Sequence, residues 1–115
     1  MVKFNSANKL NKNELYKAVT ANGTKFNSKN FIIFLLKKNN SPTRLGITVS
    51  NKVGGAVVRN RVKRIVRQFI YDYFEKMPGN SDIVIIAKRS VSSKINCNYH
   101  IIARELKNIL ANKEL

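Results

Sequence analysis

The sequence Arg44-Leu-Gly-Ile-Thr-Val-Ser-Asn-Lys-Val-Gly-Gly-Ala-Val-Val-Arg-Asn-Arg-Val-Lys-Arg64 changes its pattern halfway along. Over residues 45–50 the pattern alternates, which is typical of a β-strand with one buried face. Gly54 and Gly55 interrupt that alternation. From residue 56 to about residue 75 the apolar residues recur at helical spacing, so the segment predicts a strand, a turn and a long helix, with residues 78–79 ending the helix.

At about 100° per residue, this helix has an apolar side and a basic side. The apolar stripe consists of Val58, Val62, Ile65, Val66, Phe69 and Tyr73, and the other side holds Arg59, Asn60, Arg61, Lys63, Arg64 and Arg67. Like charges four residues apart repel, and an anionic partner would relieve that repulsion. Arg donates paired hydrogen bonds to phosphate, so we expect contact with nucleic acid, although a charge run alone often marks a solvated surface.

The overall charge favours the same kind of partner. The 115 residues include 22 Lys and Arg against 6 Asp and Glu, a net charge of +16, while 43% of residues are hydrophobic. A polyanion would bind such a chain through counterion release. An anionic membrane is the alternative, but no apolar run is long enough to span a bilayer. The first ten residues also lack the apolar run of a secretory signal, so we expect a cytoplasmic protein with no membrane partner.

The segments before residue 50 predict a helix and a hairpin. Asn11 and Glu14 are spaced as in a helix cap, Leu15, Ala18 and Val19 follow at helical spacing, and Gly23 supplies a left-handed stop. Residues 31–36 form a β-branched and aromatic run, and a turn at residues 39–42 leads to the strand at 45–50. We expect these two strands to pair as a hairpin, with a further short strand near residues 25–27.

The segments after the long helix predict one strand and one helix. Residues 83–87 are a short apolar strand, and Ile102, Leu106, Ile109 and Leu110 indicate a closing helix. The expected order is α-β-β-β-α-β-α in a single domain over residues 1–115, of the α+β class, with a mixed sheet packed by helices. The strands on either side of the long helix should be parallel, and such crossovers are normally right-handed.

The residues that catalysis or metal binding would need are scarce. Cys97 and His100 are the only residues of their types, so they predict neither a disulfide nor a zinc site. A protein nuclease would need clustered carboxylates or a histidine pair. The six carboxylates are scattered, and Glu14 and Asp82 are explained as a helix cap and a strand-entry residue. We therefore predict no catalytic residue and no metal ligand in the chain.

The segment 44–64, with Arg59-Asn60-Arg61 after a Gly-containing turn, resembles the bacterial ribonuclease P protein family. The resemblance continues through Arg67, through residues 82–89, and back to residues 12–14 and 23–24. It implies an α/β two-layer sandwich with a left-handed βαβ crossover. It also implies a subunit that binds the catalytic RNA and precursor tRNA and promotes 5′ maturation, while the RNA carries out the hydrolysis with Mg²⁺. No obligate protein partner is implied.

The resemblance also implies roles for individual residues. Those facing the catalytic RNA are Lys52, Arg59, Asn60, Arg61, Lys63, Arg64 and Arg67, and those facing the precursor's 5′ leader are Tyr16, Phe34, Lys12, Lys88 and Arg89. Tyr16 and Phe34 would stack on unpaired bases, although aromatics at such spacing more often pack in a core. The chain has Thr20 where relatives commonly have Phe, and Asn51 where Lys is usual.

Two other classes of protein share the charge and the size. A ribosomal or other structural RNA-binding protein would not need an aromatic cleft for a single strand. A DNA-binding module would insert the basic helix in a major groove, but the cations surround the exposed arc and no dimer seam is evident. We rank both hypotheses below membership of the ribonuclease P protein family.

Overall fold

The described part of the chain folds into three α-helices and one four-stranded sheet. The computed structural model describes residues 9–10, 13–39, 42–77 and 79–111. The elements in chain order are α1 (Asn13–Asn22), β1 (Thr24–Asn27), β2 (Phe31–Lys37), β3 (Arg44–Thr48), α2 (Ala56–Tyr73), the 3-10 turn η2 (Phe74–Lys76), β4 (Ser81–Ala87), the 3-10 turn η3 (Arg89–Ser92) and α3 (Tyr99–Ala111). The predicted α+β class and element order are confirmed. Asn11 and Pro78, predicted as a cap and a stop, lie outside the described residues.

The strands lie in the order β1-β2-β4-β3. β1 pairs with β2 and β2 with β4 antiparallel, whereas β3 pairs with β4 parallel, so the sheet is mixed as predicted. The parallel pair on either side of α2 is confirmed, and the hand of its crossover stays a prediction. The expected hairpin of residues 31–36 with 45–50 is wrong, because β4 lies between the two strands. β4 is apolar on both faces, and a central position buries both of them.

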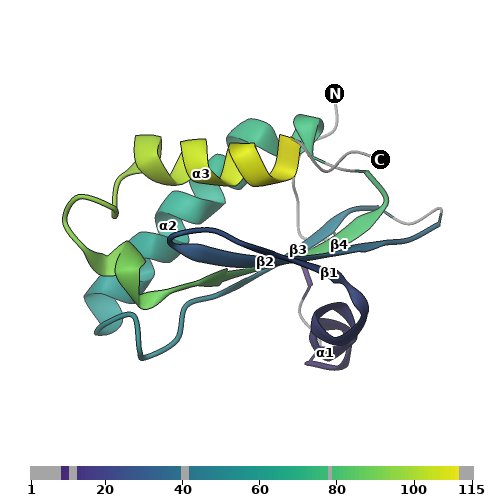
Figure 1. Cartoon of the computed structure of the whole chain (residues 1–115), viewed down its shortest axis with the longest axis horizontal. Coiled ribbons are helices and arrows are strands. Elements are labelled where there is room, and N and C mark those ends of the chain that lie inside the picture. The colour runs from purple at the N-terminus through teal and green to yellow at the C-terminus, as the bar shows by residue number, and fades with distance from the viewer. Residues whose placement is uncertain (1–8, 11–12, 40–41, 78, 112–115) are drawn as a thin grey trace.

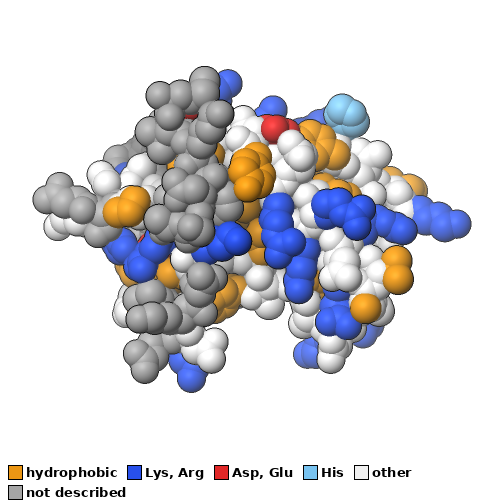
Figure 2. Space-filling view, turned by 180° about the vertical axis from the view of Figure 1, so that it is seen from behind, with side chains coloured by type: hydrophobic (Ala, Val, Ile, Leu, Met, Phe, Trp, Pro, Cys, Tyr) orange, Lys and Arg blue, Asp and Glu red, His pale blue; other side chains and the backbone are white. Residues whose placement is uncertain are grey.

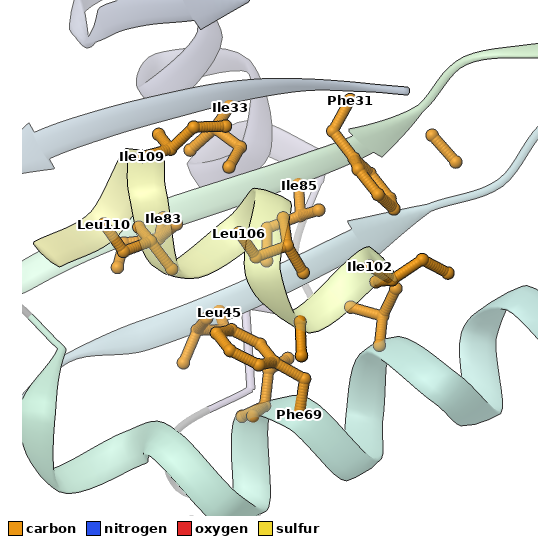
Figure 3. Packing of buried hydrophobic residues seen from close by; sticks show 14 of the residues in the cluster. Phe31, Ile33, Leu45, Phe69, Ile83, Ile85, Ile102, Leu106, Ile109 and Leu110 are labelled. Carbon is orange, nitrogen blue, oxygen red and sulfur yellow. The ribbon is translucent and has the colours of Figure 1, made fainter. Parts of the chain in front are cut away.

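One face of the sheet carries the main core. α2 and α3 both cover this face, above the sheet in Figure 1. Alternate strand residues such as Phe31, Ile33 and Ile85 point to it, where they meet Phe69 of α2 and Leu106 of α3 (Figure 3). All five are fully buried. The predicted apolar stripe of α2 is confirmed, because its members are either buried or packed against this core.

Among the described helices, α1 alone covers the other face of the sheet, and it lies below the sheet in Figure 1. A small cluster forms here, with Leu10, Val19 and Val84 buried and with Phe34 half-buried against them. α1 ends before Gly23, whose N–H donates to the Val19 carbonyl at 2.8 Å. The predicted helix end is confirmed, but the predicted left-handed conformation is wrong, because Gly54 is the one described glycine with a positive φ. A Cβ at position 23 would lie 2.6 Å from that oxygen, so the close approach of the backbone is what requires a glycine here.

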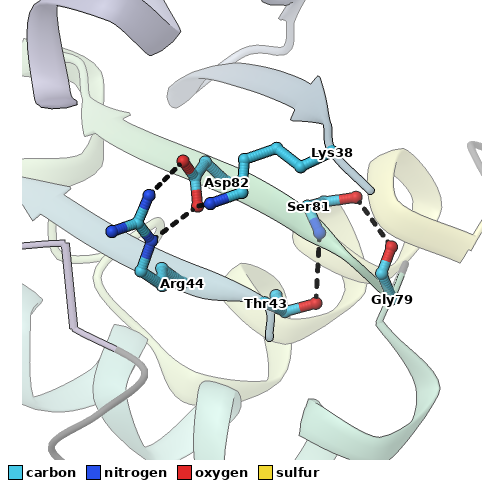
Figure 4. A network of polar contacts seen from close by, with 6 residues as sticks. All are labelled: Lys38, Thr43, Arg44, Gly79, Ser81 and Asp82. Atoms are coloured by element: carbon cyan, nitrogen blue, oxygen red, sulfur yellow. Dashed lines mark hydrogen bonds and ion pairs between the residues drawn. The ribbon is translucent and has the colours of Figure 1, made fainter. Parts of the chain in front are cut away.

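Asp82 joins three strands at one end of the sheet. Its carboxylate accepts hydrogen bonds from Arg44 Nε at 2.9 Å and Nη2 at 2.8 Å, and Lys38 Nζ lies 3.2 Å away (Figure 4). The hydrogen bond to Asp82 raises the pKa of Arg44. Asp82 is buried and is the second residue of β4, so it is a structural ion-pair partner within the strand.

Candidate nucleic-acid interface

The basic side of α2 faces away from the core. Asn60, Arg61, Arg64 and Arg67 are exposed, and Arg59 and Lys63 are half-buried. Lys and Arg side chains form a band across the face of the molecule on which α2 lies (Figure 2). The first turn of α2 contains no acidic residue, and Gly55 caps it without a side-chain hydrogen bond. The positive end of the helix dipole and the cations therefore reinforce each other, which favours an anionic ligand.

The cations of α2 have no carboxylate partner among the described residues. Within the same ranges, the only ion pairs join Asp82 to Lys38 and Arg44. Glu105 accepts hydrogen bonds from Ser28 and from Asn30, and Asp72 accepts one from Tyr99. Asp82, Glu105 and Asp72 are thus engaged within the fold, and the positive charge of α2 is left for an external anion.

Two further cations lie at the start of α2. Arg89 of η3 donates to the carbonyl of Lys52 at 3.2 Å, and Arg59 donates to the carbonyl of Gly54 at 3.1 Å. These bonds bring Lys52, Arg59 and Arg89 together where the loop after β3 enters the helix. Arg89, predicted to bind the leader, is therefore tied to Lys52, which was predicted to bind the catalytic RNA. Asn51 lies beside Lys52, exposed in the same turn.

Tyr16 and Phe34 lie on the same face of the sheet, although they come from different elements. Both are half-buried and belong to the small cluster beneath α1. The Tyr16 hydroxyl hydrogen-bonds the Thr48 hydroxyl, and burial raises the pKa of Tyr16 to about 12. A Cβ at Gly46 would lie 2.8 Å from Tyr16 Cε2, so the glycine makes room for the ring. Sequence reasoning missed Gly46 and Thr48 as supports, because only the tertiary fold brings α1 over β3.

The sheet register places a cation beside Phe34. Phe34 is opposite Lys25 on β1 and Val84 on β4, and residues opposite each other in a sheet point to the same side. Lys25 is exposed, so one row of the sheet combines an aromatic ring with a cation. Lys25 was not predicted, because its role depends on pairing between β1 and β2. Thr20 is on α1, where its hydroxyl donates to the Lys17 carbonyl at 3.1 Å.

Lys88 is held close to the turn between β1 and β2. Its Nζ donates to the Ser28 carbonyl at 2.6 Å, and its N–H donates to the Asn30 carbonyl at 2.8 Å. Glu105 secures the same turn through the N–H of Asn30 at 2.7 Å. Part of the hydrogen-bonding capacity of Lys88 is thus used within the fold. Lys12, the remaining predicted leader contact, lies outside the described residues.

Neither a metal cluster nor a membrane-spanning helix is found in the described ranges. No three His, Cys, Asp or Glu side chains there are grouped so that they could hold a metal ion. No helix there is both long and apolar enough to cross a bilayer. Cys97 is half-buried against the main core, and His100 is exposed in the first turn of α3 beside Tyr99. The site is a set of cations and aromatic rings, which is the composition of a surface that binds single-stranded nucleic acid.

Comparison with known proteins agrees with this chemistry. The family model described as Ribonuclease P matches residues 4–114. The chain belongs to the ribonuclease P protein family. It is 34% identical over 113 residues to the ribonuclease P protein component of Clostridioides difficile, which covers 97% of this chain and 96% of the relative. It is 39% identical over 83 residues to that of Bacillus mycoides, covering 71% of this chain and 72% of the relative.

Solved structures of ribonuclease P proteins share the fold. The protein from Thermotoga maritima superposes with a TM-score of 0.78 at 27% identity, covering 86% of this chain and 94% of that one. A mutant of the Staphylococcus aureus protein gives a TM-score of 0.80 at 25% identity, covering 90% and 85%. As a ribonuclease P protein component, the chain is a subunit of the tRNA 5′-processing endoribonuclease and acts with the RNA subunit.

Proposed function

We propose that the exposed side of α2 binds the RNA subunit of ribonuclease P and that the sheet face with Tyr16 and Phe34 binds the 5′ leader of precursor tRNA. The observation that carries this assignment is that the cations of α2 have no carboxylate partner among the described residues. Six residues make the first surface, namely Arg59, Asn60, Arg61, Lys63, Arg64 and Arg67, with Lys52 at its end. The leader surface adds Lys88 and Arg89, together with Lys12.

The protein's contribution is electrostatic and positional. Its cations screen phosphate repulsion between the RNA subunit and the precursor, which lets Mg²⁺ bind the RNA productively at a lower concentration. Hydrolysis belongs to the RNA and its Mg²⁺. The whole chain acts as one RNA-binding domain in the cytoplasm, without an obligate protein partner. A leader held by the protein favours the precursor over the mature tRNA.

The test is precursor cleavage at low Mg²⁺ by the cognate RNA subunit. We expect wild-type protein to stimulate 5′ cleavage and the triple variant Arg59→Ala, Arg61→Ala, Arg64→Ala to lose most of that stimulation. Its matched control removes three exposed cations outside α2 with Lys37→Ala, Lys76→Ala and Arg104→Ala. Equal loss in the two triple variants would reduce the effect to net charge and contradict the assigned surface. Cleavage by the protein without the RNA subunit would contradict the assignment of hydrolysis to the RNA.

The leader surface needs a separate test. Phe34→Ala should weaken binding of precursor tRNA to the holoenzyme by about tenfold, because base stacking on an aromatic ring is lost. Binding of mature tRNA, which has no leader, should stay unchanged. If precursor and mature tRNA weaken together, Phe34 acts through the framework, and the reading as a general structural RNA-binding protein gains support.

A further inference from the structure

Tyr71 is a large side chain left exposed on the basic side of α2. It is 61% exposed, whereas Phe69 and Ile70 beside it in sequence are fully buried. Arg67 precedes it by four residues and Arg64 by seven, so the three lie along one stripe of the helix. An aromatic ring within a row of arginines is the composition of a stacking site for an unpaired base.

A partly open hollow lies beside Tyr71. It has a volume of about 290 Å³ and is lined by residues of the N-terminal segment, α1, β3 and α2. Leu10, Leu45 and Ile70 are buried and make its floor apolar. Lys9 and Arg67 contribute positive charge to its wall. An apolar floor with a cationic wall suits a flat base that is attached to a phosphate.

A second, more open hollow also lies beside Tyr71. Its volume is about 430 Å³, and its lining consists of Asn60, Arg64, Arg67, Gln68 and Tyr71. Arg67 and Tyr71 line both hollows, so they form the boundary between them. The two hollows therefore adjoin at Arg67 and Tyr71. The amides of Asn60 and Gln68 can donate to and accept from sugar or base edges.

We propose that Tyr71 and Arg67 form a binding site for one unpaired nucleotide of ribonuclease P RNA. The base stacks on the Tyr71 ring within the first hollow, Arg67 binds its phosphate, and the adjoining nucleotide lies in the second hollow. This inference rests on the proposed function, in which α2 faces the RNA subunit. It adds a base-dependent contact to a surface that was otherwise assigned only through its cations.

The RNA subunit is favoured over the leader as the source of this nucleotide. Both hollows lie along α2, and the first is also lined by residues 45–47 of β3, the edge strand. Phe34 of the leader surface is on β2 and lines neither hollow, whereas Tyr16 of that surface lines the first hollow. The second hollow is lined by residues of α2 alone, so a strand that follows the arginines of α2 reaches Tyr71 from that side without crossing the leader surface.

Binding of the cognate RNA subunit over a range of salt concentrations separates stacking from charge. Tyr71→Ala should raise the dissociation constant by about tenfold and leave the salt slope unchanged, because no phosphate contact is lost. Tyr71→Phe keeps the ring and should bind within about twofold of wild type. Arg67→Ala should lower the magnitude of the salt slope by about one. Ile95→Ala, which truncates a side chain that is 77% exposed outside both hollows, is the control.

The outcomes distinguish this site from the proposed function. Wild-type affinity in Tyr71→Ala would overturn the site while leaving the function in place, provided the wild-type protein binds the RNA and stimulates cleavage. Equal weakening in Tyr71→Ala and Tyr71→Phe would assign the effect to the hydroxyl and would also overturn stacking. Failure of the wild-type protein to bind the RNA subunit would overturn the proposed function itself.

Photo-cross-linking identifies the source of the base. The holoenzyme is assembled with 4-thiouridine either in the RNA subunit or in the precursor leader, and cross-linked peptides are mapped by mass spectrometry. We expect the peptide containing Tyr71 to cross-link to the RNA subunit, with the yield reduced several-fold in Tyr71→Ala and kept in Tyr71→Phe. Cross-linking of this peptide only to the leader would overturn the assignment to the RNA subunit.

Discussion

The two faces of the sheet use alternate residues of the same strands for different purposes. On β2, Phe31, Ile33 and Leu35 are buried beneath α2 and α3, whereas Ile32, Phe34 and Leu36 point to the other face and are half-buried. The first set stabilises the fold, because burial removes it from water. The second set remains partly accessible beside α1 and is available to a ligand. A strand that is apolar on both faces can therefore serve a core and a binding surface together.

The largest effect is expected from a core residue on the side of the sheet that α2 and α3 cover. Phe69→Ala should lower the free energy of unfolding by about 3–5 kcal/mol, because it leaves a cavity at a fully buried position. Urea unfolding followed by circular dichroism measures this change. Phe34→Ala on the other face is the matched comparison and should cost less than half as much. Equal losses would contradict the division of the two faces into core and binding surface.

The second prediction concerns the ion pair of Asp82, which lies at one end of the sheet. Asp82→Asn should lower the free energy of unfolding by about 2 kcal/mol, because charged hydrogen bonds to Arg44 are lost and Lys38 loses its partner. Chemical denaturation measures the loss, and Glu75→Gln, at an exposed position, is the control. A loss no larger than in that control would show that the ion pair contributes little to stability.

The third prediction concerns Gly46, which leaves room for Tyr16 of α1 against the sheet. Gly46→Ala places a Cβ 2.8 Å from Tyr16 Cε2, so the ring has to move. We expect a loss of about 1–3 kcal/mol from overpacking, together with weaker binding of precursor tRNA. Gly79→Ala is the control, because nothing lies within 4 Å of its added Cβ. Unchanged stability and precursor binding in Gly46→Ala would show that Tyr16 has room to shift without cost.

The smallest effect is a pH dependence that the tyrosines impose. Burial raises the pKa of Tyr16 to about 12, and burial with a hydrogen bond to Asp72 raises that of Tyr99 to about 12. Both groups are neutral when protonated, so their contribution to stability is present below pH 10 and is lost between about pH 10 and 12. Tyr16→Phe should weaken this loss, measured by denaturation at high pH. An unchanged profile in Tyr16→Phe combined with Tyr99→Phe would contradict the raised pKa values.

Local patterns were sufficient to predict the elements and the basic surface. The helical spacing of Val62, Val66 and Phe69 predicted the buried side of α2, and the cations left over predicted its exposed side. Tyr71 is visible in the same pattern, four residues after Arg67, and a helical wheel extended to it would have found the ring among the arginines. The Arg59-Asn60-Arg61 segment identified the family, which the comparisons confirm.

Pairing between distant residues was decided only by the tertiary structure. The order β1-β2-β4-β3 depends on which strand gains most from burial on both faces, and neighbours in sequence gave the wrong answer for β2 and β3. The room that Gly46 leaves for Tyr16 and the row that joins Lys25 to Phe34 depend on that order. Periodicity along a chain reports which side of an element is apolar, because that depends on neighbouring residues alone. Which surfaces then meet depends on burial summed over the whole core.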